Sequence, residues 1–173
     1  ADGGVKKVTT ELLTLARSLG EPSAVWVGPG YSPAAEATLA EFGANIVYVA
    51  ESPALAAHPV APKAEVLAHL VAEKQPAAVI VASTADGKEA AGRLAVRIES
   101  GVITDAVAIS PDFVATQSVF GGSTVVHSQV TTGTPIFTVR PNSTAPVAAA
   151  AAAARADVSI TLSEAAMKAA VTG

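Results

Sequence analysis

Residues 77–109 have the sequence AAVIVASTADGKEAAGRLAVRIESGVITDAVAI, and the order of apolar and polar residues within them decides the fold class. The stretch opens with a continuous apolar run at 77–82, which is typical of a strand buried on both faces. An amphipathic helix follows and ends before Gly101, and a second strand is predicted at 106–109. A strand, a helix and another strand in this order favour the right-handed crossover of a parallel sheet.

The same alternation precedes this stretch. Short β-branched runs predict strands at 24–27 and 46–49. Apolar residues at helical spacing predict three further helices, which begin at Val5, Pro33 and Pro62 and end before Gly20, Gly43 and Pro76. We therefore predict an α/β fold, namely a three-layer α/β/α domain with a mostly parallel, doubly wound, Rossmann-like sheet.

The pattern changes after Asp105, where no further helix separates the strand-like segments. These segments are 107–109, 113–120, 123–130 and 136–139. Gly121-Gly122 lies between two of them and predicts a β-hairpin with a two-residue turn, because glycine adopts positive φ at little cost. We therefore expect a hairpin added to the parallel sheet.

Beyond Pro146 the sequence predicts a tail. The alanine tract at 148–154 has high helix propensity but carries only methyl groups, and we interpret it as a spacer. A strand is predicted at 157–162, and a short helix at 163–171 with Ser163 as its N-cap. We therefore divide the chain into a domain at 1–145 and a linker and tail at 146–173.

The beginning of the sequence indicates that the sheet lacks its first strand. A helix is predicted from Val5, whereas an α/β unit begins with a strand that is central in most doubly wound sheets. Residues 1–4 include neither an initiator Met nor a signal-peptide pattern, so we expect the natural protein to start upstream. An upstream strand or another segment should fill the slot between 24–27 and 77–82, because each buried unpaired backbone group costs about 1–3 kcal/mol.

The composition excludes several classes of protein. Half of the 173 residues are apolar and 15% are charged, which predicts a folded domain rather than a disordered chain. The absence of cysteine excludes disulfides, thiolate metal sites and cysteine nucleophiles, and it is compatible with a reducing compartment. A net charge of −4 with scattered basic residues gives no footprint for nucleic acid. No apolar run approaches the ~20 residues of a membrane-spanning helix.

Two loops resemble phosphate sites only in part. Gly28-Pro29-Gly30 matches the first half of a dinucleotide fingerprint, but Pro33 stands where a third glycine belongs and Pro29 lacks an N–H. The loop from Ser83 to Glu89 follows a strand, where α/β sheets usually bind ligands. It has no GxxxxGK pattern, and we favour a structural role with Asp86 as the N-cap of a capping-box-like helix start.

No constellation of catalytic or metal-binding residues emerges. His58, His69 and His127 are far apart and have no acids at ligand spacing. Asp105 precedes the predicted strand at 106–109, where a turn or cap role competes with a functional one. Arg140 places a cation at a sheet margin, and both an interdomain contact and a surface arginine with its stem along apolar residues stay open.

Several motifs between 77 and 141 occur in an order that is similar to the α subunit of electron transfer flavoprotein. They are Gly87-Lys88, the helical Arg93, Ile103-Thr104-Asp105-Ala106, Phe120-Gly121-Gly122 and Thr138-Val139-Arg140-Pro141. The segment TLAEFGANIVYVAE at 38–51 agrees more loosely with the same family. The resemblance covers roughly residues 5–145.

This resemblance implies the N-terminal domain of an α subunit, which docks a β subunit in a heterodimer. Such a heterodimer carries electrons from several dehydrogenases, including those of fatty acid oxidation, to a membrane quinone oxidoreductase or another acceptor through one FAD. It is an electron carrier rather than an enzyme, and it resides in the bacterial cytoplasm or the mitochondrial matrix.

The resemblance also implies where the cofactors lie. A C-terminal domain, absent from 1–173, holds most of the FAD, and a structural AMP belongs to the β subunit. We therefore expect no flavin-binding residue here. We single out Asp105, Phe120, Gly121 and Arg140 as possible interface residues. The alternative is a small adenine-nucleotide-binding module, which would need a stronger phosphate loop than Gly28-Pro29-Gly30.

Overall fold

A computed structural model describes residues 4–170 of the chain. Its helices are α1 (Lys7–Arg17), α2 (Pro33–Glu41), α3 (Pro53–Ala57), α4 (Ala61–Lys74) and α5 (Ala85–Arg97), with a 3₁₀ turn at Phe120–Gly122. Its strands are β1 (Ser23–Val27), β2 (Ile46–Ala50), β3 (Val79–Ala82), β4 (Val102–Ile109), β5 (Val114–Val119), β6 (Thr124–Gln129), β7 (Ile136–Val139) and β8 (Ala154–Asp157).

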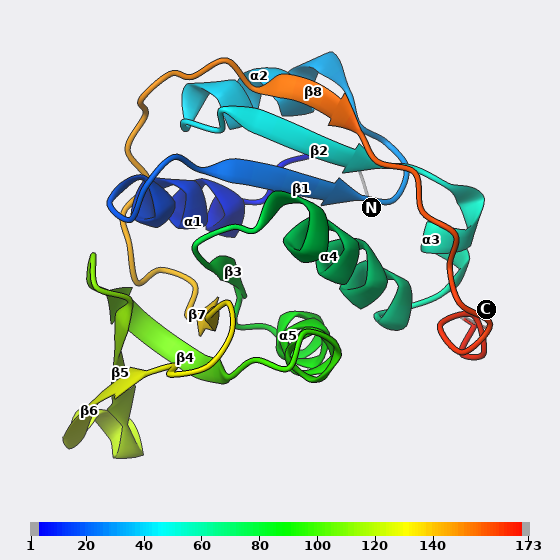
Figure 1. Ribbon diagram of the computed structural model, residues 1–173. Coiled ribbons are helices and arrows are strands. Elements are labelled where there is room, and N and C mark those ends of the chain that lie inside the picture. The colour runs from blue at the N-terminus through cyan, green and yellow to red at the C-terminus, as the bar shows by residue number, and fades with distance from the viewer. Residues whose placement is uncertain (1–3, 171–173) are drawn as a thin grey trace.

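The strands form two sheets (Figure 1). The first has the order β1-β2-β8 and is entirely parallel. The second has the order β3-β7-β4-β5-β6, in which β3, β7 and β4 are parallel and β5 and β6 are antiparallel additions. The prediction of a mostly parallel sheet with an added hairpin is therefore confirmed.

Helices cover both faces of this strand layer. On one face, Leu13 of α1 packs with Val47, and Leu15 of the same helix packs with Phe137. On the other face, Val66 of α4 packs against the first sheet, while α5 covers Ile136 of the second. Neighbouring residues of β7 thus serve opposite faces, as the two-residue period of a strand requires. The three-layer α/β/α architecture is confirmed.

The predicted slot lies between the unpaired edges of β1 and β3. Gly28 N–H donates to Ala50 O (2.9 Å), so by alternation the N–H groups of Val25 and Val27 face away from β2. Val79 N–H donates to Pro135 O (2.9 Å), so by the same alternation the backbone N–H of Ile80 faces away from β7. Within residues 4–170 no hydrogen bond joins β1 to β3, and no other segment pairs with these edges. That an upstream strand fills the slot stays a prediction.

The hairpin is present, but its predicted two-residue turn is wrong. β5 and β6 are joined by four residues, of which Phe120 and Gly121 have φ of 51° and 67° and Gly122 has φ of 94°. Ser123 N–H donates to Phe120 O (3.3 Å), which closes the 3₁₀ turn. The left-handed conformations therefore extend to Phe120, so the strand ends one residue earlier than its β propensity suggested.

The alanine tract forms no helix within the part of the chain that is described. Ala149, Ala151 and Ala153 donate their N–H groups to the carbonyls of Glu41, Ala40 and Ala44, at 2.8–2.9 Å. Methyl side chains let this segment lie close against its neighbours, and Ala153 is buried. Strand pairing with β2 follows at 154–157, instead of the predicted 157–162. Tertiary hydrogen bonds thus override helix propensity here.

The predicted tail helix is also wrong for the described residues up to 170. Residues 164–167 form hydrogen-bonded turns, in which Ala166 N–H donates to Ser163 Oγ (3.2 Å). Ser163 therefore caps a turn rather than an α-helix, and the predicted end at Val171 lies outside the described residues. The division into a domain at 1–145 and a tail at 146–173 stays a prediction.

The short helix α3 was not predicted, although the sequence contains a capping residue followed by proline at its start. Ser52 caps α3 by accepting a hydrogen bond from Leu55 N (3.4 Å), and Pro53 occupies its first position. The same Ser-Pro pair starts α2, where Ser32 was predicted as the cap. β4 also starts at Val102 rather than at 106, because its first residues pair with β7.

Phe137→Ala should destabilise the 173-residue chain by about 3–5 kcal/mol, because Phe137 is fully buried between the sheet and α1 and its loss leaves a cavity. Phe120→Ala is the matched control, since Phe120 is 83% exposed and should change stability by less than about 0.5 kcal/mol. Urea unfolding followed by circular dichroism measures both. Equal midpoints for the two variants would show that this core is misassigned.

Candidate docking site at the base of the hairpin

Three polar side chains meet where β3 and β7 end beside β4. Ser83 Oγ donates to Asp105 Oδ1 (2.6 Å) and lies 3.0 Å from Thr138 Oγ1. Thr138 is fully buried, and its Oγ1 accepts a hydrogen bond from Asp105 N (3.0 Å). The carboxyl ends of parallel strands thus bring together residues that are 22 to 55 positions apart in the sequence.

Asp105 lies at an irregularity in β4. Its φ is 58°, and the register of β4 against β7 shifts between Ile103 and Ala106. Aspartate tolerates this left-handed conformation better than most residues, and the extra residue of the bulge turns its carboxylate toward the start of α5. There Lys88 Nζ lies 2.8 Å from Asp105 Oδ2. Asp105 therefore occupies an irregular backbone position and also makes a polar contact through its side chain.

The start of α5 places Lys88. A Cβ on Gly87 would lie 2.0 Å from Ala82 O, so only glycine lets the helix begin this close to the end of β3. The N-cap is Thr84, whose hydroxyl accepts from Gly87 N (3.1 Å). The prediction of Asp86 as the cap is wrong. Asp86 lies in the first turn, where a carboxylate stabilises the helix N-terminus, and it pairs with Lys63.

The surroundings of Asp105 favour its charged form. Hydrogen bonds from the Lys88 ammonium and from the Ser83 hydroxyl hold the pKa of Asp105 below its ordinary value. Burial opposes this shift, and the positive charges of Lys88 and Arg140 add to it. The carboxylate therefore pairs with Lys88 at neutral pH, and the nearby charge of Arg140 adds to its stabilisation.

Arg140 connects this cluster to the hairpin. Its backbone N–H donates to Ala106 O (2.9 Å), and its Nη2 donates to Ser118 O of β5 (2.7 Å). Gln117 Nε2 donates to Thr104 O (2.7 Å), and Ser128 Oγ of β6 donates to Gln117 Oε1 (3.0 Å). The base of the hairpin is thus tied to β4 and β7 by side chains as well as by strand pairing.

The four residues singled out from the sequence fall into two groups. Asp105 and Arg140 lie together at the base of the hairpin, whereas Phe120 and Gly121 form its exposed tip. Sequence reasoning missed Ser83, Lys88 and Thr138 as members of the base, although Gly87-Lys88 at the end of a strand was a usable signal. An interface role for these residues stays a prediction.

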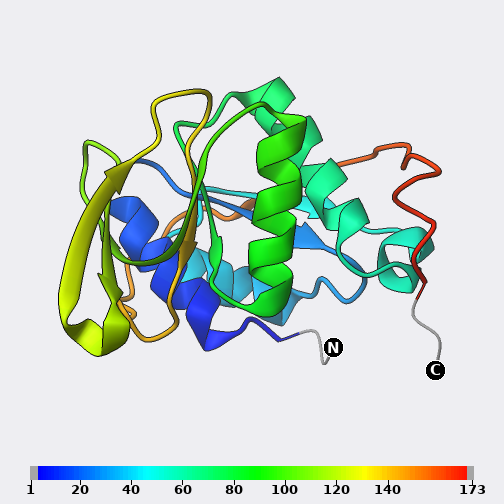
Figure 2. The same ribbon diagram turned by 90° about the horizontal axis from the view of Figure 1, so that it is seen from below.

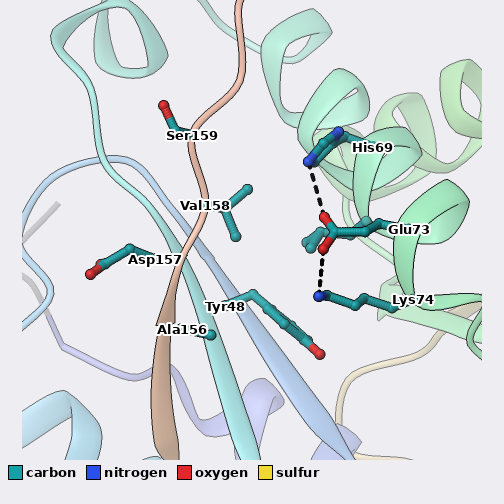
Figure 3. Close-up of a pocket in the computed structure, with 9 residues that line it drawn as sticks. Tyr48, His69, Glu73, Lys74, Ala156, Asp157, Val158 and Ser159 are labelled. Atoms are coloured by element: carbon teal, nitrogen blue, oxygen red, sulfur yellow. Dashed lines mark hydrogen bonds and ion pairs between the residues drawn. The ribbon is translucent and has the colours of Figure 1, made fainter.

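A second candidate is a polar hollow of about 240 Å³ between α4 and the chain around β8. Figure 3 shows His69, Glu73 and Lys74 on the α4 side and Tyr48 opposite, with Asp157 pointing away. Glu73 lies between its two neighbours, 3.3 Å from His69 Nε2 and 2.6 Å from Lys74 Nζ. The carboxylate of Glu73 is therefore engaged by both neighbours, and the Lys74 ammonium is paired with it.

The other candidates from the sequence have structural partners. The carbonyl of Gly28 accepts from Trp26 Nε1 (3.0 Å), His127 Nδ1 lies 3.2 Å from Thr116 Oγ1, and His58 Nδ1 lies 2.8 Å from Ala169 O. Between residues 4 and 170 no group of three or more metal-binding side chains comes together. None of the helices described there is long and apolar enough to span a membrane.

Asp105→Asn should lower the free energy of unfolding by about 1 kcal/mol at pH 7, because it removes the carboxylate but keeps a residue suited to positive φ. The pKa of Asp105 is lowered from 3.8, so its charge stabilises the fold above that value and this contribution disappears as the pH falls through the folded pKa. Urea unfolding of both proteins at a series of pH values from 7 down to the most acidic pH at which both still fold measures the difference. A gap that did not narrow as the pH fell below 3.8 would contradict the role of the charge.

Comparison with known proteins assigns the family. A sequence model of the electron transfer flavoprotein domain matches residues 1–166. The chain is 49% identical over 140 residues to an electron transfer flavoprotein subunit alpha of Mycobacterium leprae and 47% identical over 141 residues to that of Mycobacterium tuberculosis. These alignments cover 80–81% of this chain and 44% of the relatives. The chain therefore spans less than half the length of these curated relatives, and it belongs to the electron transfer flavoprotein family.

Proposed function

We propose that this chain is the scaffold of an electron transfer flavoprotein α subunit and docks the β subunit through its hairpin. The whole protein would pass electrons from dehydrogenases to a respiratory acceptor through FAD held mainly outside residues 1–173. The names of the relatives support an electron carrier rather than an enzyme. The observation that carries the docking role is a hairpin without charge, fixed at its base and exposed at its tip.

The composition of the hairpin supports this role. Residues 113–130 contain no Asp, Glu, Lys or Arg, although the whole chain has 26 of them (11 basic and 15 acidic). Phe120 is 83% exposed and Val125 is 58% exposed, and Val126, on the opposite face of β6, is 38% exposed. The cores of protein interfaces are depleted in charge and enriched in aromatic residues, whereas ordinary surfaces are not.

Its rigidity supports the role as well. The hydrogen bonds of Arg140 and Gln117 fix the hairpin relative to β4 without any partner present. A surface that is already ordered loses less conformational entropy on binding than a mobile one. The cluster around Asp105 thus acts as a support for the docking surface.

The same cluster counts against the alternative of an adenine-nucleotide module. Lys88, the basic residue near the start of α5, is paired with Asp105 and is thereby engaged. The loop at Gly28-Pro29-Gly30 leads into a helix whose first position is Pro33, which has no N–H to offer a phosphate. We therefore propose that FAD binds in another part of the longer protein and that AMP, if present, belongs to the β subunit.

Phe120→Ala in the longer α protein should weaken its affinity for the β subunit about tenfold or more, because a large exposed aromatic at the centre of an interface dominates binding. Val96→Ala is the control, since Val96 is 81% exposed on α5 away from the hairpin. Biolayer interferometry with immobilised β measures both Kd values. Equal affinities for wild type and Phe120→Ala would contradict docking through the hairpin.

The 173-residue chain alone should bind neither FAD nor AMP at micromolar concentration, whereas the longer protein with its β partner should show flavin absorbance near ~450 nm. The reason is that Lys88 in the loop is already paired with Asp105, and Lys74 in the hollow next to α4 is already paired with Glu73. Isothermal titration calorimetry measures binding to the chain. A micromolar dissociation constant for either nucleotide would favour the alternative module.

A further inference from the structure

The segment that follows β8 lies along α3 and α4 without joining a sheet. Its side chains at 158–163 alternate between half-buried and exposed. The half-buried ones pack with Leu55 of α3 and Val66 of α4, and they belong to Val158, Ile160 and Leu162. Val158 points toward α4 in Figure 3. In the described part of the chain no strand pairs with 159–163, so this segment depends on other contacts for its position along the helices.

Glu65 of α4 provides such a contact at the end of this segment. Glu65 Oε2 accepts a hydrogen bond from Ser163 N (2.9 Å), and Glu65 Oε1 accepts one from Ser163 Oγ (2.5 Å). Arg97 of α5 donates to the same Oε1 (2.6 Å). Both oxygens of the carboxylate are therefore engaged, and Ser163 makes two of the three hydrogen bonds.

This carboxylate differs from the other paired acids of α4 and α5. The Glu65 side chain is 9% exposed, whereas those of Asp86, Glu73 and Glu89 are between 50% and 72% exposed. Burial alone would raise the pKa of Glu65, but the hydrogen bonds from Ser163 and the charge of Arg97 hold it below its ordinary value. Moving Ser163 away would remove the partner of Oε2, which costs more than the loss of an ordinary surface contact.

A second contact holds the chain after Ser163. Ser163 Oγ accepts from Ala166 N (3.2 Å) at the start of the turns at 164–167, and Ala166 is buried. His58, the C-cap residue of α3, has its Nδ1 at 2.8 Å from Ala169 O. The path of the chain is thus fixed on α4 at Ser163 and at the end of α3 at Ala169.

We propose that Glu65 is a positioning residue, which fixes through Ser163 where and in which direction the chain leaves this domain toward the flavin-holding part of the longer protein. The inference rests on the proposed function, because it places that part after residue 173. A carboxylate that bonds both the N–H and the hydroxyl of one residue sets orientation as well as position. Glu65 lies on α4, away from the hairpin (Figure 1), so its loss should leave β binding unchanged.

The test replaces the carboxylate of Glu65 in the longer α protein without changing its shape. Glu65→Gln puts an amide N–H₂ group in place of one of the two acceptors. Glu73→Gln is the matched control, because Glu73 lies on the same helix but is paired with His69 and Lys74. In Glu65→Gln, amides at 163–167 should exchange hydrogen about tenfold faster or more than in wild type or Glu73→Gln.

The distance to the flavin distinguishes positioning from a merely structural contact. Glu21→Cys, in the exposed turn between α1 and β1, takes a coumarin label in a longer α protein without other reactive cysteines. Time-resolved energy transfer from coumarin to flavin then gives the distribution of their distances. Glu65→Gln should shift and broaden this distribution relative to Glu73→Gln, while the FAD content and the Kd for the β subunit stay the same.

Other outcomes separate this inference from the proposed function. If the exchange at 163–167 rises but the distance distribution does not change, Glu65 only fastens the chain and the inference is wrong. Should Glu65→Gln fail to fold, Ser163→Ala, which removes the hydroxyl but keeps the N–H, should give a smaller shift of the same kind, and no shift would refute the inference. If wild-type protein carries no flavin, the proposed function and this inference both fall, whereas loss of β binding alone refutes only the docking role.

Discussion

The packing of α1 and α4 across two separate sheets is the constraint on which the rest of the structure depends. Leu13 and Leu15 of α1 contact different sheets, and so do Val66 and Leu67 of α4. No strand pairing between residues 4 and 170 joins β1 to β3, so these two helices connect the halves of the strand layer. Among the described residues, the two sheets are therefore held together by the apolar contacts of these helices and not by strand pairing.

The two sheets have different roles in the chain. In the sheet β1-β2-β8, the segment after the alanine tract pairs with β2 as strand β8. Further along the chain, Ser163 donates hydrogen bonds to Glu65 of α4 through both its N–H and its hydroxyl. The sheet β3-β7-β4-β5-β6 ends in the hairpin. The hairpin and the segment that follows β8, up to residue 170, lie on opposite sides of the molecule in both views (Figures 1 and 2).

The sequence pattern predicted the elements that depend on interactions between residues close together in the chain. The strands near 24–27 and 46–49, the Ser32-Pro33 cap and the hairpin follow from β-branched runs, capping chemistry and glycine. The alanine tract was interpreted only as a spacer, because its hydrogen bonds to distant carbonyls cannot be predicted from propensity. The base of the hairpin was only half predicted. Asp105 and Arg140 stood out as charges at strand ends. Ser83 and Thr138 come close to Asp105 only because β7 lies between β3 and β4, and this strand order cannot be predicted from the sequence pattern.

Hydrogen exchange of the α protein, free and bound to the β subunit, tests the docking role of the hairpin most directly. Amides of the hairpin at residues 119–129 should exchange more slowly in the complex than in the free protein. Amides of α5 around Val96 should exchange alike in both. A stable complex in which residues 119–129 gain no protection, while another surface does, would contradict docking through the hairpin.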